Sequence, residues 1–370
     1  MELREGDFEA FFNAPFELYG ETTPYVSPMK SDLRRFYTVG DNPLFPTPGN
    51  FALFTVHRDG KIMGRIGAHV HPASNELYKT NTAYFAYFDC ADDAEAATTL
   101  LDAAENWARQ HGFDTIAGNF NLTAMQQIGV MTGGFEGVPY VDQVYGPPHV
   151  ARLLAENGYE AYFPMRTFEI DLESFNPDSM LGPKQQDILN SPDWTFAEVT
   201  RKEIPARLAE ARQLLNSGFS HNPMFVPLTA EEFEFQAKEL KWIIDPRITS
   251  VIHYKGEPAA IALVIPDLNP FIRATRSRIS WTTPWHFLVN RLNRTRALVV
   301  YVSVREDLHA KGVMSAMMAK LLPTMRAAGY RQLGITWVWD ENTGSNRLME
   351  RLGAKPLHRT HLFRKSLVAS

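Results

Sequence analysis

The sequence predicts an α/β protein with mixed, α+β-type sheets, built as two similar domains in tandem, each a central sheet flanked by helices. Three observations lead to this prediction. The chain has 370 residues, a length that favours two domains. A series of hairpin, helix and strand occurs twice along it, and each copy closes on a similar segment that ends in glycine.

Each half opens with a predicted hairpin. Residues 54–70 read as two strands joined by a turn at Asp59-Gly60, and residues 251–265 repeat the pattern with a turn at Lys255-Gly256. A histidine precedes the turn glycine at the same spacing in both copies. Glycine suits such tight two-residue turns because it adopts positive φ angles without strain.

An amphipathic helix follows in each half. Its apolar face is formed by residues at helical spacing, in the first half Ala97, Leu100, Leu101, Ala104, Trp107 and Ala108, and in the second half Met314, Met317, Met318, Leu321, Leu322 and Met325. Each helix is expected to end at a glycine, Gly112 or Gly329, which suits a left-handed cap.

The closing segments are residues 152–158 and 347–353, which share an Arg-Leu start and a glycine end. The connector between the halves is rich in Pro, Ser, Asn and Asp and has no periodicity. We therefore predict an N-terminal domain at 1–172, a linker at 173–193 and a C-terminal domain at 194–370.

The composition excludes several classes of protein. A net charge of -5 and a pI near 6.1 give no general attraction to nucleic acid, which we do not expect as a partner. The single cysteine, Cys90, rules out a disulfide framework and is expected to be buried. The N-terminus lacks the pattern of a secretory signal, and no apolar run is long enough to span a bilayer. A cytoplasmic location is expected.

The strongest motif lies between Leu298 and Ser315, where a strand runs into a turn of small residues that opens a helix. Consecutive backbone N–H groups at such a turn, together with the helix N-terminus, suit a pyrophosphate group. Lys311 adds a positive charge. The turn alone is weakly specific, because many α/β folds place a helix after a strand.

Together with the segment Asn342-Thr-Gly-Ser-Asn346 and the duplicated layout, this motif resembles the GNAT (Gcn5-related N-acetyltransferase) superfamily. The resemblance implies an acyl-CoA co-substrate and a backbone N–H near Val302 to Val304 that polarises the thioester carbonyl. It implies cofactor contacts from Val302, Val304, His309, Ala310, Lys311, Gly312, Val313, Met314, Ser315, Asn342 and Asn346. The chain departs from the family pattern at His309, where Gln or Arg is usual, and at Met314, where Gly or Ala is usual.

The equivalent turn of the first half brings carboxylates to the start of its helix. Asp92 and Asp93 suit helix capping but repel a pyrophosphate, so we do not expect this half to bind CoA by the usual route. The loops at 118–121 and 133–139 are expected to shape a pocket for the acceptor.

Acyl transfer to an amine also needs a proton donor for the departing thiolate. Met349 stands where the family often has a tyrosine, so another group is needed. The candidates are Tyr301, His221 and Asp340 or its neighbour Glu341. The alternatives are a core aromatic for Tyr301, a loop cap for His221 and solvated carboxylates for the others.

His69 and His71 place two imidazoles on one strand face without a third ligand of suitable spacing. A metal ion usually takes more ligands than two, so we expect no metal.

Residues 270–296 contain no carboxylate and interleave arginines with aromatic side chains. The predicted membrane or anion patch is Arg273, Arg276, Arg278, Trp281, Trp285, Arg291 and Arg294. Such a mixture suits the phosphate level of a lipid surface, here the cytoplasmic face of the inner membrane. One alternative is a packed insertion whose arginines bind CoA phosphates or pair with the other half. The other is single-stranded nucleic acid.

The whole layout, including residues 18–19 and 26–35, resembles a group of bacterial tandem GNAT-like proteins that contains bacterial ceramide synthases. This resemblance implies N-acylation of a lipid-like amine acceptor, a sphingoid base, by a fatty acyl-CoA. The alternatives are a small-molecule N-acetyltransferase that uses acetyl-CoA, and a non-catalytic protein that kept the fold, as Met314 and Met349 suggest.

Overall fold

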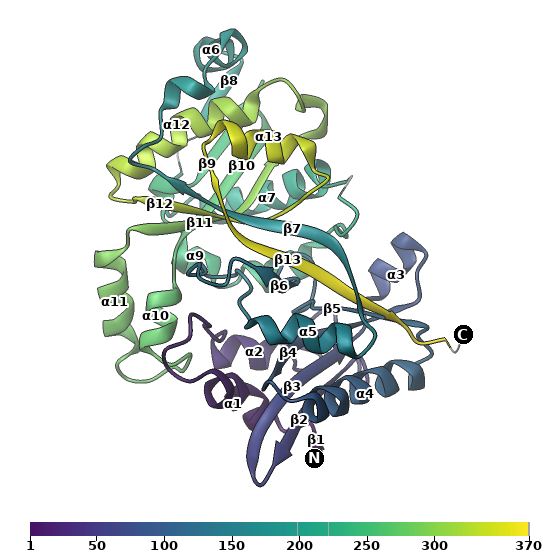
Figure 1. The fold of residues 1–370 in the computed structure, drawn as a ribbon. Helices are drawn as coiled ribbons and strands as arrows, with labels where there is room; N and C mark the ends of the chain where they lie inside the picture. The colour runs from purple at the N-terminus through teal and green to yellow at the C-terminus, as the bar shows by residue number, and fades with distance from the viewer. Residues whose placement is uncertain (198, 221, 369–370) are drawn as a thin grey trace. The chain divides into compact units, whose positions relative to one another are not determined.

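The structure is a computed structural model that describes residues 1–197, 199–220 and 222–368. It divides into two compact units, each assembled from separate stretches of the chain (Figure 1). The first unit comprises Met1–Met165, Asn269–His286 and His358–Ser370, and the second comprises Arg166–Leu268 and Phe287–Leu357. The boundaries expected from the sequence, 1–172 and 194–370, do not contain this exchange of segments.

The first unit contains elements from both ends of the chain. Its helices are α1 (Phe8–Tyr19), α2 (Lys30–Phe36), α3 (Pro72–Tyr78), α4 (Ala94–Gln110), α5 (Pro148–Glu156) and α10 (Asn269–Ala274). Its strands are β1 (Glu2–Glu5), β2 (Phe51–Arg58), β3 (Lys61–His69), β4 (Thr82–Cys90), β5 (Thr115–Gly118), β6 (Val130–Gly133) and most of β13 (Lys355–Ser366).

The sheet of the first unit runs in the order β1-β2-β3-β4-β5-β13, with β6 also paired to β13. The parallel ladder between β4 and β5 extends only from Thr82 and Thr115 to Phe85 and Gly118. Beyond that point β4 continues to Cys90 paired with β3 on its other side, so β4 and β5 diverge. Strand β13 pairs antiparallel with β5, which places the last strand of the chain in the first sheet.

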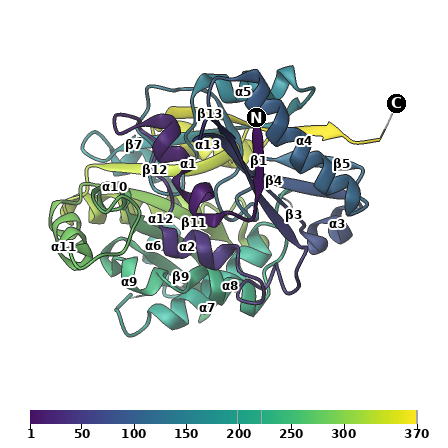
Figure 2. The same ribbon diagram turned by 90° about the horizontal axis from the view of Figure 1, so that it is seen from below.

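Two apolar clusters cover the two faces of this sheet. One contains residues of α4 and α5 with Phe85 and Cys90 of β4, and the other contains residues of α1 and α2 with Ala86 and Tyr87. Helices α4 and α5 lie on one side of the strands and α1 and α2 on the other (Figure 2). Cys90 is buried, as expected.

The second unit contains the remaining elements. Its helices are η1 (Pro177–Met180), α6 (Pro183–Asn190), α7 (Ile204–Gly218), α8 (Ala230–Ala237), α9 (Leu240–Ile243), η2 (Pro246–Ile248), η3 (Glu306–Leu308), α12 (Val313–Ala327), α13 (Thr343–Arg351) and most of α11 (Thr283–Asn293). Its strands are β8 (Trp194–Ala197), β9 (Ser250–Tyr254), β10 (Glu257–Pro266), β11 (Arg296–Val304), β12 (Gln332–Trp339) and the second part of β7 (Glu160–Asp171).

The sheet of the second unit runs β7-β12-β11-β10-β9-β8. Its parallel ladder between β11 and β12 ends at Val299 and Ile335, after which β11 continues to Val304 and β12 to Trp339. The same divergence of two parallel strands therefore occurs in both units. Strand β11 also carries a bulge opposite Leu263 and Val264 of β10.

Both predicted hairpins are confirmed. The turn residues Asp59 and Gly60, and likewise Lys255 and Gly256, all have positive φ, as a two-residue hairpin turn requires. Both long helices are also confirmed, and Gly112 and Gly329 adopt the left-handed conformation just past their ends.

Helix α12 lies at the centre of the second core. It buries Met317, Met318 and Leu322 against β9 and β10, and a buried side chain of this kind contributes about 1.5–3 kcal/mol. Segment 173–193, expected to be an irregular linker, forms η1 and α6, and both pack against α12. Helix α7 packs against β10 and β11. No helix in the described part of the chain is both long enough and apolar enough to cross a membrane.

Candidate functional site

The turn that leads into α12 has the backbone geometry expected of an anion site. Gly312 adopts a left-handed conformation with φ of 88° immediately before the helix. Among the described residues no side chain caps the helix, and its first backbone bond runs from the Ala316 N–H to the Gly312 carbonyl. The N–H groups of Val313, Met314 and Ser315 therefore have no intrahelical acceptor and suit an anion.

The turn itself lies at the surface. His309, Ala310 and Lys311 are exposed, so the ammonium group of Lys311 is accessible to a ligand. The imidazole of His309 folds back instead, and its Nε2 donates to the Val304 carbonyl at 2.8 Å. The backbone N–H of His309 donates to the carbonyl of Glu306. The role of His309 toward a pyrophosphate stays a prediction.

Two residues that the sequence reasoning missed lie at this turn. Gln185 of α6 places its side-chain amide against Gly312, and its Oε1 accepts from the Gly182 N–H. Arg351, in the last turn of α13, donates to Ser315 Oγ at 3.0 Å. The sequence shows a basic residue near the end of α13, but only the fold shows that its side chain reaches the first turn of α12.

The residues proposed for the cofactor on α13 already have local partners. Asn342 caps that helix by accepting from the Ser345 N–H, and Asn346 donates to the carbonyls of Trp339, Asp340 and Asn342. These bonds fix the start of α13. Contacts of the two asparagines with a cofactor stay predictions.

Two of the proposed catalytic residues, Tyr301 and Asp340, lie in different segments of the second unit. Tyr301 is half-buried on β11, in the part that has diverged from β12, close in sequence to Val302 and Val304. Asp340 accepts from Arg166 Nε at 3.1 Å, so its carboxylate is part of an ion pair. His221 lies outside the described residues. Met349 is buried in the core of the second unit.

The equivalent helix of the first unit, α4, has carboxylates at its N-terminus. Asp93 caps α4 by accepting from the Ala96 N–H at 2.9 Å, and Arg58 binds both Asp93 and Glu95. The expected capping role of Asp93 is confirmed. Asp92 pairs with Arg152. The first turn of α4 thus differs from the uncapped first turn of α12.

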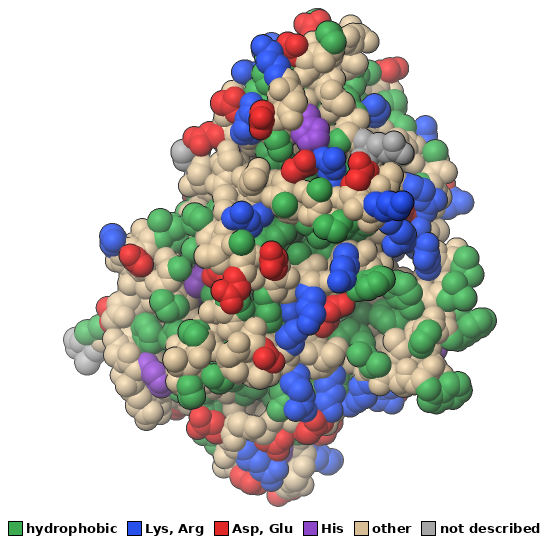
Figure 3. Space-filling model, turned by 180° about the vertical axis from the view of Figure 1, so that it is seen from behind, with side chains coloured by type: hydrophobic (Ala, Val, Ile, Leu, Met, Phe, Trp, Pro, Cys, Tyr) green, Lys and Arg blue, Asp and Glu red, His purple; other side chains and the backbone are tan. Residues whose placement is uncertain are grey.

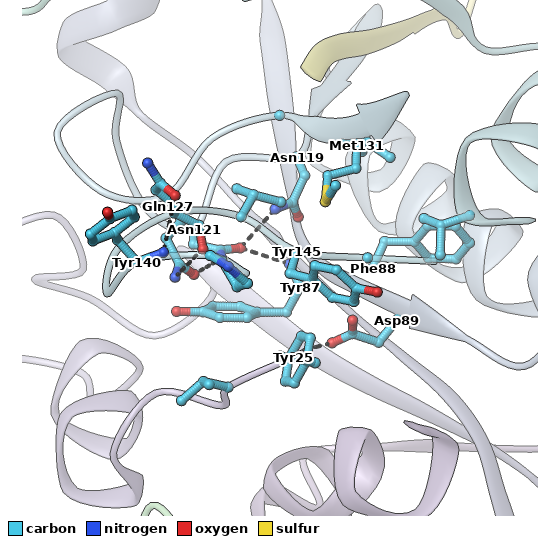
Figure 4. Close-up of a pocket in the computed structure, with 18 of the residues that line it drawn as sticks. Tyr25, Tyr87, Phe88, Asp89, Asn119, Asn121, Gln127, Met131, Tyr140 and Tyr145 are labelled. Carbon is cyan, nitrogen blue, oxygen red and sulfur yellow. Dashed lines mark hydrogen bonds between the residues drawn. The ribbon is translucent and has the colours of Figure 1, made fainter. Parts of the chain in front are cut away.

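The first unit instead contains a small open cavity of about 50 Å³ where β4 and β5 diverge (Figure 4). About half of the lining side chains are polar, among them Tyr87, Asp89, Asn119, Asn121 and Gln127, and Gly146 lines the cavity with its backbone. The lining includes Asn119 and Asn121 from one predicted acceptor loop and Pro139 from the end of the other.

A buried ion pair lies beside this cavity. Arg65 is fully buried, and its Nε donates to Asp89 Oδ2 at 2.8 Å while Nη2 donates to the Tyr25 hydroxyl at 2.8 Å. Tyr19 donates to the other oxygen of Asp89. Burial and the nearby Asp89 carboxylate raise the pKa of Tyr25, so this hydroxyl keeps its proton.

The basic insertion is largely held by the protein itself. Arg273 donates to the carbonyls of Thr23 and Pro24, Arg278 donates to Asn13 at 2.6 Å, and Arg276 lies 3.7 Å from Glu21. In the second unit Arg294 pairs with Asp245 at 2.6 Å. These contacts favour the packed-insertion alternative for these four arginines.

What the insertion exposes is mainly apolar. Trp281 is 92% exposed and Trp285 64% exposed, and Leu288 and Leu292 of α11 are exposed as well, beside the exposed Arg291. Trp285, Leu288 and Leu292 follow one another at helical spacing, so they share one face of α11. Hydrophobic side chains gather over α11 in the space-filling view (Figure 3).

Comparison with known proteins is consistent with this geometry. Residues 212–354, which include α12 and α13, match the model of the acetyltransferase (GNAT) family. The chain is 24% identical over 379 residues to protein YghO of Escherichia coli strain K12, covering 99% of this chain and 94% of that protein. It is 22% identical over 368 residues to the bacterial ceramide synthase of Caulobacter vibrioides, covering 98% and 95%.

Solved structures resemble the whole chain. A tandem GNAT protein from the clavulanic acid biosynthesis pathway covers 100% of both chains with a TM-score of 0.59 at 14% identity. A GCN5-related N-acetyltransferase from Sphaerobacter thermophilus covers 100% of this chain and 96% of its own with a TM-score of 0.54, also at 14% identity.

The uncapped turn, the diverging strands and the family-model match define an acyl-CoA-dependent N-acyltransferase with two related folds. The match to the GNAT family model lies within the half that carries the turn, and the fold of the whole chain is similar to that of a tandem GNAT protein.

Proposed function

We propose that this protein transfers a long-chain acyl group from acyl-CoA to the amine of a sphingoid-type base, giving a (dihydro)ceramide. The observation that carries the donor assignment is the uncapped first turn of α12, with Gly312 left-handed and Lys311 exposed beside it. The acceptor assignment is supported by the similarity to the bacterial ceramide synthase over 98% of the chain.

The anion contacts divide between backbone and side chains. The N–H groups of the first turn would bind diphosphate oxygens, and Lys311 would add charge. We add Arg351 to this set, because its guanidinium already lies at Ser315 in the same turn. Charge-assisted hydrogen bonds of this kind are about twice as strong as neutral ones.

In the chemical step the neutral amine attacks the thioester carbonyl and forms the C–N bond, the C–S bond breaks, the nitrogen releases one proton to solvent and the thiolate takes one up. Backbone N–H groups at Val302 to Val304 would stabilise the oxyanion. With Met349 buried in the core, we assign the proton donor to Tyr301, which lies on the same diverging part of β11. The ion pair of Asp340 with Arg166 makes Asp340 the weaker choice.

We place the substrates at the cytoplasmic surface of the inner membrane, reached through the exposed apolar face of α11. Long-chain bases partition into lipid, and a helix that presents tryptophan and leucine next to arginine suits the interface between headgroups and acyl chains. The exposure of Trp281, Trp285 and Leu292 supports this placement.

The test is turnover by the purified chain with sphinganine in lipid vesicles, given palmitoyl-CoA or acetyl-CoA. We expect N-palmitoylsphinganine by mass spectrometry, release of free CoA, and at least about tenfold preference for palmitoyl-CoA, equivalent to about 1.4 kcal/mol. Tyr301→Phe should lower kcat with little change in KM.

Two outcomes would contradict the proposal. Preference for acetyl-CoA with a small amine would make the protein a small-molecule N-acetyltransferase. Absence of turnover together with absence of binding of either thioester by calorimetry would make it a non-catalytic protein with this fold.

A further inference from the structure

We propose that the first unit has a ligand site of its own: the cavity between β4 and β5 binds a small amino alcohol through hydrogen bonds that the ligand donates. The inference does not depend on the acyl-transfer reaction, since all the residues that line the cavity belong to the first unit.

The cavity forms because the two strands separate. Phe85 and Gly118 are the last paired residues of β4 and β5, and a Cβ on Gly118 would overlap the carbonyl and ring of Phe85. Past this point Tyr87 and Asp89 continue along β4, while Asn119 and Asn121 follow β5 (Figure 4). The strands therefore bring two sets of polar side chains to one cavity.

A chain of amide hydrogen bonds fixes which atoms the cavity offers. Asn121 Nδ2 donates to Gln127 Oε1 at 3.1 Å, so Asn121 Oδ1 is left to accept, and it does so from the Tyr87 N–H and from Asn119 Nδ2. This order leaves Asn119 Oδ1 as an acceptor at the end of the chain. A ligand group that reaches this oxygen would have to donate a hydrogen bond to it.

That acceptor has no protein partner. Asn119 is 93% buried, being 7% exposed, and its Oδ1 accepts no hydrogen bond from the residues that the structure describes. An unpaired buried acceptor costs about 1–3 kcal/mol, and a bound hydroxyl or ammonium group removes that cost. This atom is the second, independent sign of a ligand besides the cavity itself.

The charges of the lining select against anions. None of the described lining residues is Lys or Arg, and the lining carboxylate, Asp89, is neutralised by the buried Arg65. The rings of Tyr25 and Tyr87 also line the cavity and favour a cationic or neutral group over a negative one. An amino alcohol satisfies both conditions, because it has amine and hydroxyl donors and no negative charge.

The cavity also differs from a CoA site. Asp93 caps the first turn of α4, and Asp92 follows the end of β4 closely, so the turn beside these strands carries negative charge where a diphosphate would need free N–H groups. The first unit thus has diverging strands like those of the second unit, but its helix α4 lacks an uncapped first turn.

The test is calorimetry on the full chain with 2-amino-1,3-propanediol as the probe and glycerol 3-phosphate as the anionic comparator. We expect saturable 1:1 binding of the amino alcohol and none of the phosphate. Asn119→Ala should weaken binding by about tenfold, in line with the loss of one charge-assisted hydrogen bond. Asn106→Ala, the same change on the exposed face of α4, should leave it unchanged.

A second variant covers the case in which Asn119→Ala fails to fold, which thermal melting would show. Gly146 lines the cavity, lacks a positive φ, and a Cβ there meets nothing within 4 Å, so Gly146→Phe adds bulk without a clash at Cβ. We expect it to abolish binding while the melting temperature holds. Equal binding of the phosphate, absence of amino-alcohol binding, or binding that both variants leave intact would each overturn the proposal.

Discussion

The side-chain amide of Gln185 occupies the space that a Cβ atom on Gly312 would need. Gln185 is held there by the Gly182 N–H, which donates to its Oε1. Helix α6 packs against α12, and the Gln185 side chain meets α12 at the turn proposed to bind the diphosphate. Two features therefore favour glycine at position 312: its left-handed φ and its close contact with the Gln185 side chain.

Replacing Gly312 by alanine should therefore cost more than a left-handed backbone alone. The strain of a positive φ is about 1–2 kcal/mol, and overpacking adds about 1–3 kcal/mol. Gly256→Ala is the matched control, because Gly256 has φ of 84° and open space around it. Urea unfolding should show Gly312→Ala to be the more destabilising of the two by about 1–3 kcal/mol.

The same comparison in a Gln185→Ala background isolates the contact. Removing the amide should reduce the cost of Gly312→Ala to nearly that of Gly256→Ala. If the two glycine variants lose the same free energy of unfolding in the presence of Gln185, the packing argument is wrong.

Charge at the α12 turn should control the affinity for acyl-CoA. Lys311→Glu and Arg351→Ala should each raise the Kd for palmitoyl-CoA by about tenfold or more, since each removes a cation from the diphosphate site. Calorimetry at two salt concentrations measures this, and the difference from the wild type should shrink at high salt.

Arg326→Ala is the control for this experiment. Arg326 is exposed in the last turn of the same helix, so its loss changes the net charge as much as Arg351→Ala does but leaves the charge at the first turn unchanged. An equal loss of affinity in this variant would show that net charge, and not the turn, governs binding.

Membrane association should depend on tryptophan more than on arginine. Trp281→Ser and Trp285→Ser together should lower the fraction that floats with anionic vesicles by at least about tenfold, because burial of each large aromatic side chain in the interface contributes about 1.5–3 kcal/mol. Trp242→Ser is the control, since Trp242 is 66% exposed on another helix, α9.

Arg278 separates the two interpretations of the insertion. Its guanidinium lies over the rings of Phe12 and Phe16 at 4.8 and 5.3 Å and donates to Asn13. We expect Arg278→Ala to lower the unfolding free energy by about 1–2 kcal/mol with little effect on flotation. The reverse result would restore the arginine patch that the sequence suggested.

The parts of the fold that could be predicted from the sequence are those with local causes. The turns at Gly60 and Gly256, the apolar faces of α4 and α12 and the Asp93 cap each depend on residues a few positions apart. Periodicity and turn chemistry are sufficient to find such features.

The exchange of segments could not be predicted in this way. The pairing of β13 with β5 joins residues that are far apart in the chain and leaves no periodic signal. Arg273 binds backbone carbonyls of Thr23 and Pro24, which no charge pattern reveals. For the same reason the cavity was anticipated only through the loops at 118–121 and 133–139, and Arg351 was not anticipated at the α12 turn.

Stability should fall as the pH is lowered through the titration of His69. This side chain is fully buried in β3, its Nε2 donates to the Leu122 carbonyl at 2.9 Å, and Nδ1 has no partner among the described residues. Burial lowers its pKa from 6.5 to about 4. Between pH 6.5 and pH 4 the unfolded chain therefore binds a proton at His69 that the folded chain does not bind. The contribution of His69 to the free energy of unfolding is present above pH 6.5 and is lost as the pH falls toward 4.

The size of this effect follows from the two pKa values. Between pH 7 and pH 5 the wild type should lose about 2 kcal/mol through His69, since one pKa unit corresponds to about 1.4 kcal/mol. His69→Phe removes the titrating group, so its unfolding free energy, measured in urea at both pH values, should fall by about 2 kcal/mol less than that of the wild type. The variant starts from a lower stability because the bond to Leu122 is lost, so the change with pH is the quantity to compare. Equal changes in the two proteins would mean that His69 is protonated, or exposed, in the folded state.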